Sequence, residues 1–253
     1  MSSAEDAREL EAESGAVTHD TLLRGRVKLI QPVHGFRSSL DPVLLAGFIQ
    51  APYGHFLDIG CGTGALAFLL LARDAAATGL GVEIQPRLAG LAIRSVQANG
   101  FGARFAVVAS DVRDVGPVLP ADFDLVASNP PFRPLGQGVL PPQAERSLAH
   151  HEVALTLGEW LDVAKAALRP EGRLAAIYPA DRLDEMRAAL TARGLTMSRL
   201  RMVQAQADAR PSRFCFEARL SALVAETLNE TPLVVHEQGK YSAEVRLMLG
   251  EES

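Results

Sequence analysis

The stretch Leu57-Asp58-Ile59-Gly60-Cys61-Gly62-Thr63-Gly64 decides the fold. The apolar run at residues 56–59 predicts a strand, and the apolar run at residues 65–73 predicts a helix directly behind it. Glycines at alternating positions of the connecting turn let the backbone approach a ligand closely, and the first amides of the helix stay available to bind it. The sequence therefore predicts a cofactor loop between a strand and a helix.

The spacing of these glycines argues against a dinucleotide. A dinucleotide-binding fingerprint has two residues between its second and third glycines, whereas Thr63 alone separates Gly62 from Gly64. Asp58, which precedes Gly60 by two residues, also disfavours a pyrophosphate. A carboxylate there suits a ligand with an ammonium or sulfonium charge, as in S-adenosylmethionine. We therefore disfavour a nicotinamide dehydrogenase.

Strands and helices alternate along most of the chain. The predicted strands cover residues 27–32, 56–59, 79–84, 104–109, 123–128 and 172–178, and the predicted helices cover residues 41–48, 65–73, 86–99, 156–168 and 181–193. Two later β runs, at residues 197–206 and 213–224, are expected to form an antiparallel hairpin. The pattern predicts an α/β fold with a Rossmann-like, doubly wound, mostly parallel sheet and the hairpin at one edge.

The net charge of −5 is distributed unevenly. The first 20 residues hold Glu5, Asp6, Glu9, Glu11, Glu13 and Asp20 against Arg8. We expect residues 1–20 to form an acidic, disordered tail and residues 21–253 to form one domain, with residues 21–50 covering the cofactor and substrate. The rest of the chain is close to neutral, so composition neither supports nor excludes an RNA partner.

Other features of the sequence indicate a soluble protein of the cytoplasm. No apolar stretch reaches the roughly 18 residues that span a membrane, and the N-terminus lacks the parts of a signal peptide. Cys61 and Cys215 are expected to be reduced thiols, since two cysteines give no disulfide framework. The sequence has no cluster of metal ligands, so we expect no bound metal. Because no apolar stretch is long enough to span a membrane, we expect no membrane partner either.

Carboxylates follow the next two predicted strands. Glu83 closes residues 79–84, and its two oxygens can accept both hydroxyls of a ribose. Asp111 follows residues 104–109 and can accept a hydrogen bond from an adenine amine, while Val112 packs on the ring. Because the carboxyl ends of parallel strands share one edge of the sheet, these residues are expected to face the same crevice as the glycine loop.

The four residues Asn129-Pro130-Pro131-Phe132 follow the apolar run at residues 123–128. The side-chain carbonyl of Asn129 and the backbone carbonyl of Pro130 can each accept one N–H of a planar amine and so orient its nitrogen. The two prolines stiffen the loop, and Phe132 offers a face on which a flat substrate can stack. The motif predicts the catalytic site of an enzyme that methylates such an amine.

Two further groups of residues are candidates for contacts with the substrate. Phe36 and Arg37 lie between the predicted strand 27–32 and the helix 41–48, in a segment that can fold over the crevice. Four arginines near the predicted hairpin are candidates for the backbone of an RNA: Arg199, Arg201, Arg210 and Arg213.

Taken together, the motifs around Asp58, Glu83, Asp111 and Asn129 resemble the class I S-adenosylmethionine-dependent methyltransferases that act on amines. Residues 31–41, the proline-rich insert at 134–152 and residues 232–245 resemble the bacterial tRNA(Val) adenine-N6-methyltransferase family, and the resemblance runs from about residue 25 to the C-terminus. It implies a methyltransferase domain that binds S-adenosylmethionine through Gly60, Gly62, Glu83 and Asp111. Phe132 stands where that family commonly has tyrosine.

The resemblance implies methyl transfer to the N6 amine of an adenine in RNA, above all tRNA. Methylation of a protein glutamine amide is the main alternative, because release-factor methyltransferases carry a similar loop, but little room for their recognition domain precedes residue 56. A small-molecule or DNA amine is a third possibility. A non-catalytic scaffold that binds the cofactor is disfavoured, since every motif position holds a chemically competent residue.

Overall fold

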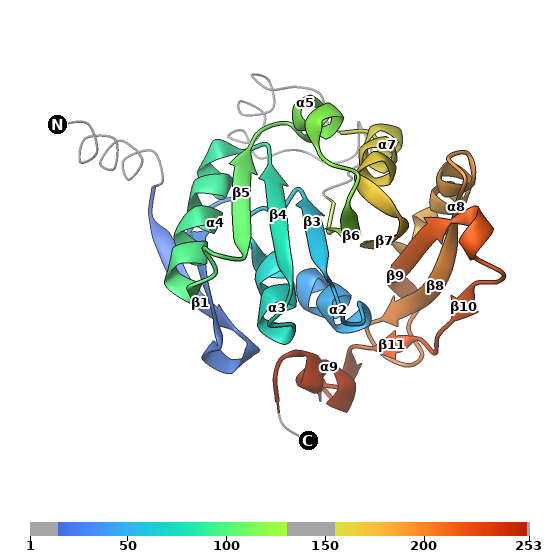
Figure 1. Ribbon diagram of the computed structural model, residues 1–253. Helices are drawn as coiled ribbons and strands as arrows, with labels where there is room; N and C mark the ends of the chain where they lie inside the picture. Colours follow the sequence, from blue (N-terminus) through green and yellow to red (C-terminus); the bar gives the residue numbers. More distant parts are fainter. Residues whose placement is uncertain (1–14, 131–154, 252–253) are drawn as a thin grey trace.

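The computed structural model describes residues 15–130 and 155–251, and a mixed sheet of nine strands forms the centre of this part (Figure 1). The strand order is β10-β8-β9-β7-β6-β3-β4-β5, and β11 pairs with β8 beside β10. The strands of this sheet are β3 (His55–Ile59), β4 (Thr78–Glu83), β5 (Phe105–Ala109), β6 (Phe123–Ser128), β7 (Leu168–Pro179), β8 (Leu195–Gln204), β9 (Pro211–Leu220), β10 (Leu228–Asn229) and β11 (Leu233–Val234).

The helices follow the strands in alternation. They are α2 (Asp41–Phe48), α3 (Ala65–Arg73), α4 (Pro86–Asn99), α5 (Val112–Val115), α7 (Leu157–Ala167), α8 (Leu183–Thr191) and α9 (Ala243–Met248). Proline in the first turn begins α2 and α4, while α7 begins with a capping box between Thr156 and Glu159. Two small antiparallel pairs lie outside the main sheet: β1 (Val17–Leu22) with β2 (Val27–Pro32), and β12 (His236–Glu237) with β13 (Lys240–Tyr241).

The pairing confirms the predicted doubly wound sheet. Strands β5, β4, β3, β6 and β7 run parallel, and β9 lies antiparallel to both β7 and β8. The predicted hairpin is therefore β8 with β9, although the short strands β10 and β11 pair with its outer side. Since parallel strands end at a common edge, the residues that follow β3, β4, β5 and β6 are brought near one another.

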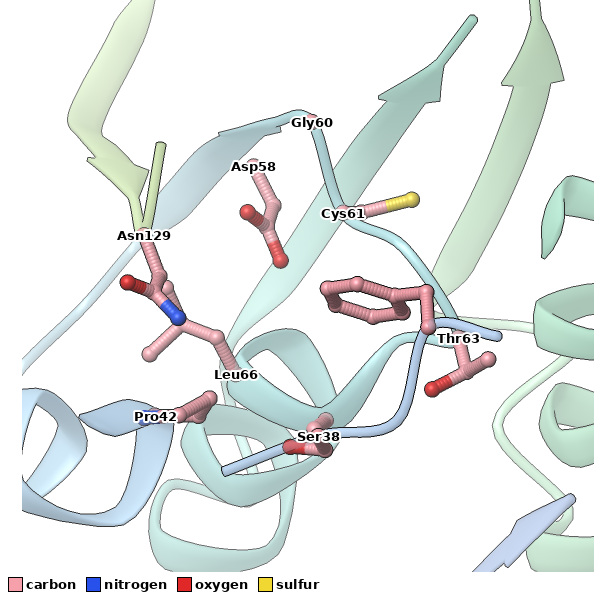
Figure 2. A pocket seen from close by; sticks show the side chains of 10 residues that line it. Ser38, Pro42, Asp58, Gly60, Cys61, Thr63, Leu66 and Asn129 are labelled. Carbon is pink, nitrogen blue, oxygen red and sulfur yellow. The ribbon is translucent and has the colours of Figure 1, made fainter. Parts of the chain in front are cut away.

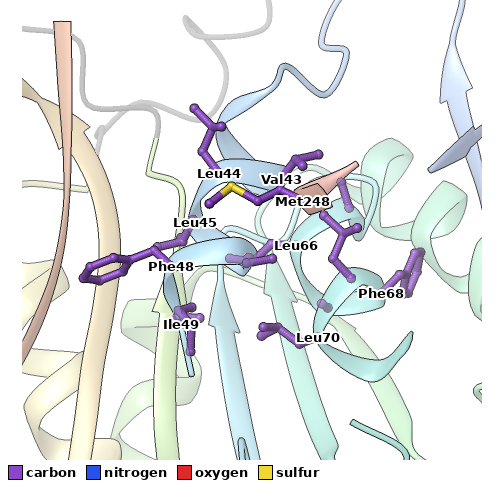
Figure 3. Packing of buried hydrophobic residues seen from close by; sticks show 14 of the residues in the cluster. Val43, Leu44, Leu45, Phe48, Ile49, Leu66, Phe68, Leu70 and Met248 are labelled. Carbon is purple, nitrogen blue, oxygen red and sulfur yellow. The ribbon is translucent and has the colours of Figure 1, made fainter. Parts of the chain in front are cut away.

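Both faces of the sheet are buried, and the alternation of side chains along each strand divides them. Phe56 of β3 and Leu125 of β6 belong to a cluster with α2, α3 and part of α4, whereas Leu57 and Val126 belong to a second cluster with α7 and α8. Figure 3 shows the first cluster where α2 and α3 pack together. Strand β3, which leads into the glycine loop, is thus held from both sides.

The C-terminal helix completes the first cluster. Met248 of α9 lies against α2 in Figure 3, where a side chain on Gly47 would come within 2.5 Å of it. The guanidinium of Arg73, at the end of α3, donates to the carbonyl of Ala46 at 2.5 Å and to that of Met248 at 2.7 Å. One arginine therefore joins three helices that lie far apart in the sequence.

The N-terminal boundary differs from the expected one. Residues 1–14 lie outside the described part, but the last residues of the expected tail form β1, which pairs with β2 from Val17 opposite Pro32 to Leu22 opposite Val27. The expectation of a disordered tail through residue 20 is wrong for Val17 to Asp20. Four of the six residues of β1 are polar, and all six are exposed or half-buried. The segment therefore lacks the run of apolar residues from which the other strands were predicted.

Within the same described part, no helix combines the length and the apolar character that crossing a membrane requires.

Two glycine substitutions should have opposite effects on stability. A side chain on Gly79 in β4 would lie 2.7 Å from the buried ring of Phe56, so Gly79→Ala should lower the free energy of unfolding by about 1–3 kcal/mol. Gly90 lies inside α4 with open space around its Cα, so Gly90→Ala should raise it by about 0.5–1 kcal/mol. Urea unfolding of the two variants measures both effects, and equal effects would contradict the packing described for β4.

Candidate active site

A pocket opens where β3 and β6 end. Four of the residues predicted from the sequence line it, namely Phe36, Asp58, Gly60 and Asn129. The others are Ser38, Pro42, Cys61, Thr63, Ala65 and Leu66. Figure 2 shows Asp58 and Asn129 entering the pocket from neighbouring strands, with Ser38 and Pro42 across from them. The structure therefore brings together the glycine loop, the Asn-Pro loop and the segment between β2 and α2.

The glycine loop turns tightly at the end of β3. The amides of Gly60 and Cys61 both donate to the carbonyl of Val82, at 2.8 and 3.1 Å. Gly60 has a φ of +72°, and no atom lies within 4 Å of the position that a Cβ would take there. A side chain on Gly62 would lie 2.9 Å from the ring of Phe36. Positive φ angles, +72° at Gly60 and +56° at Gly62, favour glycine at both positions, and a side chain on Gly62 would also have to displace the Phe36 ring.

Asp58 is an ionisable carboxyl in a fully buried position. Its side chain is 1% exposed, and its Oδ2 has no hydrogen-bond partner among the described residues. Burial raises the pKa of Asp58 to about 7; the Glu83 carboxylate raises it too, whereas a backbone hydrogen bond from Ala67 lowers it. Asp58 lines the pocket, so a cationic group bound there could pair with this oxygen, which has no partner within residues 15–130 and 155–251.

Glu83 braces the glycine loop from the end of β4. Its Oε2 accepts the amide of Gly62 at 2.8 Å and its Oε1 accepts the amide of Gln85 at 2.9 Å. Burial raises the pKa of this carboxyl, and the backbone amides of Gln85 and Gly62 lower it. Each oxygen keeps further acceptor capacity, so the predicted contact with ribose hydroxyls remains compatible with these bonds.

Asp111 has a partner that its position after β5 did not reveal. It caps α5 by accepting the amide of Arg113, and the Arg113 guanidinium donates to both of its oxygens, at 2.5 to 3.0 Å. These hydrogen bonds hold the pKa of Asp111 below its usual value. Val112 is buried behind it. Neither residue lines the pocket, so their predicted contacts with an adenine stay predictions.

Asn129 is placed by the residue before it. The hydroxyl of Ser128 is fully buried and donates to the carbonyl of Ile59 at 2.7 Å, which joins the end of β6 to the end of β3. Asn129 follows directly and lines the pocket opposite the glycine loop, and Pro130 is half-buried. Pro131 and Phe132 lie outside the described residues, as does the proline-rich insert.

The segment between β2 and α2 forms the remaining wall. Phe36 is 48% exposed and its ring covers Gly62, while the guanidinium of Arg37 turns away to Asp20 and does not line the pocket. Sequence reasoning missed Ser38, Pro42 and Thr63 as pocket residues. The first two continue the stretch that begins at Phe36, and adjacency was the only signal that could have found them.

Three of the four hairpin arginines are held in ion pairs. Arg199 contacts Glu217 at 3.1 Å and Glu230 at 2.5 Å, and Arg201 contacts Glu244 at 2.5 Å. Arg213 lies 3.5 Å from Asp41. The side chains of Arg199 and Arg201 are 14% exposed, which argues against a role at an RNA backbone, whereas Arg210 is exposed.

The pocket residues fit S-adenosylmethionine. The unpartnered oxygen of Asp58 suits its positive charge, and the open space at Gly60 admits a ligand close to the backbone. Glu83 and Asp111 supply carboxylates beyond the loop, at the ends of β4 and β5. In residues 15–130 and 155–251, no group of histidine, cysteine, aspartate or glutamate side chains could hold a metal ion.

The buried carboxyl of Asp58 should make stability depend on pH. Between its ordinary value of 3.8 and about 7, the folded protein binds more protons at this residue than the unfolded chain does. The free energy of unfolding therefore falls as pH rises through this window and levels off above it. Asp58→Asn removes the titration, so its stability relative to the parent should rise from pH 4 to pH 8, by on the order of a few kcal/mol.

Chemical unfolding at the two pH values measures this change. The matched control is Asp122→Asn, which removes an exposed carboxylate and should show no such trend. A stability difference between Asp58→Asn and the parent that is the same at both pH values would contradict the described state of Asp58.

Comparisons with known proteins agree with this geometry. The family model described as methyltransferase small domain matches residues 41–182, which include the glycine loop and Asn129. A tRNA1(Val) (adenine(37)-N6)-methyltransferase of Porphyromonas gingivalis is 34% identical over 222 residues, covering 83% of this chain and 86% of that protein. The protein of the same name from Tolumonas auensis is 31% identical and covers 75% of this chain and 78% of its own length.

Solved structures share the fold. A predicted O-methyltransferase of Agrobacterium tumefaciens superposes with a TM-score of 0.64 at 23% identity, covering 82% of this chain and 94% of its own. An M. jannaschii protein solved in complex with AdoMet has a TM-score of 0.55 at 13% identity, with 81% and 85% covered. The chain therefore belongs to the methyltransferase small domain family, as a class I S-adenosylmethionine-dependent enzyme in the group of the tRNA1(Val) (adenine(37)-N6)-methyltransferases.

Proposed function

We propose that this enzyme methylates the N6 amine of an adenine in tRNA, and that its substrate is adenine 37 of tRNA1(Val), the substrate for which its relatives are named. The observation that carries the proposal is the position of Asn129, which shares one pocket with Asp58 and the glycine loop. An amine bound at Asn129 would lie beside a methyl donor bound at that loop.

The protein's contribution to the reaction is mainly one of position. The side-chain oxygen of Asn129 and the backbone oxygen of Pro130 would each accept one N–H of the amine, which turns the nitrogen lone pair toward the cofactor side of the pocket. Bound S-adenosylmethionine supplies a methyl group on a sulfonium, which is already activated for transfer. Asp58, Gly60 and Glu83 would hold the cofactor from the ends of β3 and β4.

No dedicated base is required before the transfer. The nitrogen becomes positively charged and acidic as its new bond forms, so it can lose its proton to solvent afterwards. The main cost falls on the RNA, because the adenine must leave its stack to reach Asn129. The geometry therefore predicts that loss of the Asn129 acceptor affects the rate far more than it affects cofactor binding.

Asn129→Ala should lower kcat by about 100-fold or more, since it removes one of two orienting acceptors. The dissociation constant of S-adenosylmethionine, measured by calorimetry, should stay within about threefold of the parent, which is less than 1 kcal/mol. Asn129→Asp keeps an acceptor oxygen and should retain more activity than the alanine variant. Asn229→Ala, which changes an exposed asparagine on β10, serves as the matched control. Equal losses of rate and cofactor affinity would contradict the role of Asn129.

The substrate is tested with methyl-labelled S-adenosylmethionine and an unmodified tRNA1(Val) transcript. We expect labelled N6-methyladenosine after digestion, and no label in a transcript in which guanosine replaces adenosine 37. Label at another adenosine would overturn the proposed position. Label in a protein glutamine instead would favour the alternative substrate, and bound cofactor without any transfer would favour a scaffold.

We also propose that the protein is cytoplasmic, as the sequence led us to expect, because a tRNA substrate would be met there. Immunodetection after cell fractionation tests it.

A further inference from the structure

A single carboxylate oxygen joins three separate parts of the chain beside the cofactor pocket. Oδ2 of Asp20 in β1 accepts hydrogen bonds from the Thr18 hydroxyl at 2.8 Å, from Nε2 of Gln31 at 2.8 Å and from the Arg37 guanidinium at 2.7 Å. Gln31 belongs to β2, and Arg37 belongs to the segment between β2 and α2. Asp20 thus connects the β1–β2 pair to the segment that forms one wall of the pocket.

The bond from Asp20 fixes the orientation of the Gln31 amide. An ionised carboxylate oxygen can only accept, so it faces the NH2 group of Gln31 and leaves Oε1 on the other side. That oxygen accepts the backbone amide of Ser38 at 2.7 Å, and Ser38 lines the pocket. Gln31 is 5% exposed, so little water is present to replace either partner.

Arg37 forms the second connection. Its Nη1 donates to the Thr18 hydroxyl at 2.8 Å and to the carbonyl of Pro32 at 2.9 Å, while its Nη2 donates to Asp20. The residue before it is Phe36, whose ring covers Gly62 of the glycine loop. The two connections from Asp20 therefore hold the chain at Arg37 and Ser38, directly after the ring that covers the loop.

We propose that Asp20 is a positioning residue for cofactor binding, which acts through Gln31 and Arg37 to hold residues 36–38 against the glycine loop. This role rests on the cofactor site described above and is independent of the RNA substrate. It also gives Arg37 a function in the wall of the pocket in place of direct contact with the substrate.

The position of Asp20 lets this role be separated from overall stability. The side chains of Arg37 and Asp20 are 39% and 35% exposed, and ion pairs of that kind contribute about 0–1 kcal/mol to folding. Loss of Asp20 also leaves Nε2 of Gln31 without its acceptor, and release of residues 36–38 lets water reach that group, so the cost should appear mainly as local opening of this segment and less as a loss of global stability. The Ser38 amide reports this release directly, because its only described acceptor is Gln31.

The test compares Asp20→Ala and Asp20→Asn with the parent protein. Hydrogen exchange of the cofactor-free protein, followed by NMR, should show the Ser38 amide exchanging about tenfold faster in Asp20→Ala, which corresponds to about 1.4 kcal/mol. Calorimetry should show a dissociation constant for S-adenosylmethionine raised by about five- to tenfold. Asp20→Asn keeps a neutral acceptor oxygen and should recover part of both effects.

His19→Ala is the matched control, because His19 is the exposed neighbour of Asp20 on the opposite face of β1. It should change neither measurement. An unchanged Ser38 exchange rate or an unchanged cofactor affinity in Asp20→Ala would overturn the proposal. So would faster exchange throughout the main sheet, since that result would give Asp20 a general structural role. None of these readouts uses tRNA, so failure of the proposed substrate would leave this test intact.

Discussion

The hydrogen bond between the Glu83 carboxylate and the amide of Gly62 is the interaction on which the site depends. It joins the end of β4 to the loop after β3, in a position where an unpaired amide or an unpaired carboxylate would be costly. The amides of Gly60 and Cys61 bind the carbonyl of Val82 on the side of β4, while Gly60 and Thr63 of the same loop line the pocket. Asp58 and Asn129 reach the same pocket because β3 pairs with β6, and the bond from Glu83 fixes the loop that follows Asp58.

Much of the fold could be predicted because local and global signals agree. The helices at 41–48, 65–73 and 86–99 have the predicted bounds, since proline or glycine marks where they begin and their apolar faces meet the sheet. Part of the pocket was predictable as well, because strand order brings Asp58 and Gly60 near Asn129, whereas Ser38, Pro42 and Thr63 carried no signal of their own. Long-range pairing between short polar segments carried no comparable signal, so β1, β10 and β11 were missed.

The partners of charged side chains were the least predictable feature. Asp111 meets an arginine two residues away. Arg199 meets Glu217 of β9 and Glu230 just after β10, and it lies over the ring of Phe48, 4.4 Å from its centre. A sequence shows which residues are charged but not which of them face each other after folding. The same limit applied to Asp20, which composition assigned to an acidic tail and which the structure places beside the pocket.

The bond from Ser128 to Ile59 has a consequence for how such enzymes diversify. It joins the residue that precedes Asn129 to the last residue of β3, so the loop after β3 and the loop after β6 begin from one shared junction. The hairpin β8–β9 lies beyond β7 from this junction, so substitutions on its surface can accumulate without disturbing it. The edge of the sheet can therefore vary in sequence while the two loops that line the pocket keep their relative position.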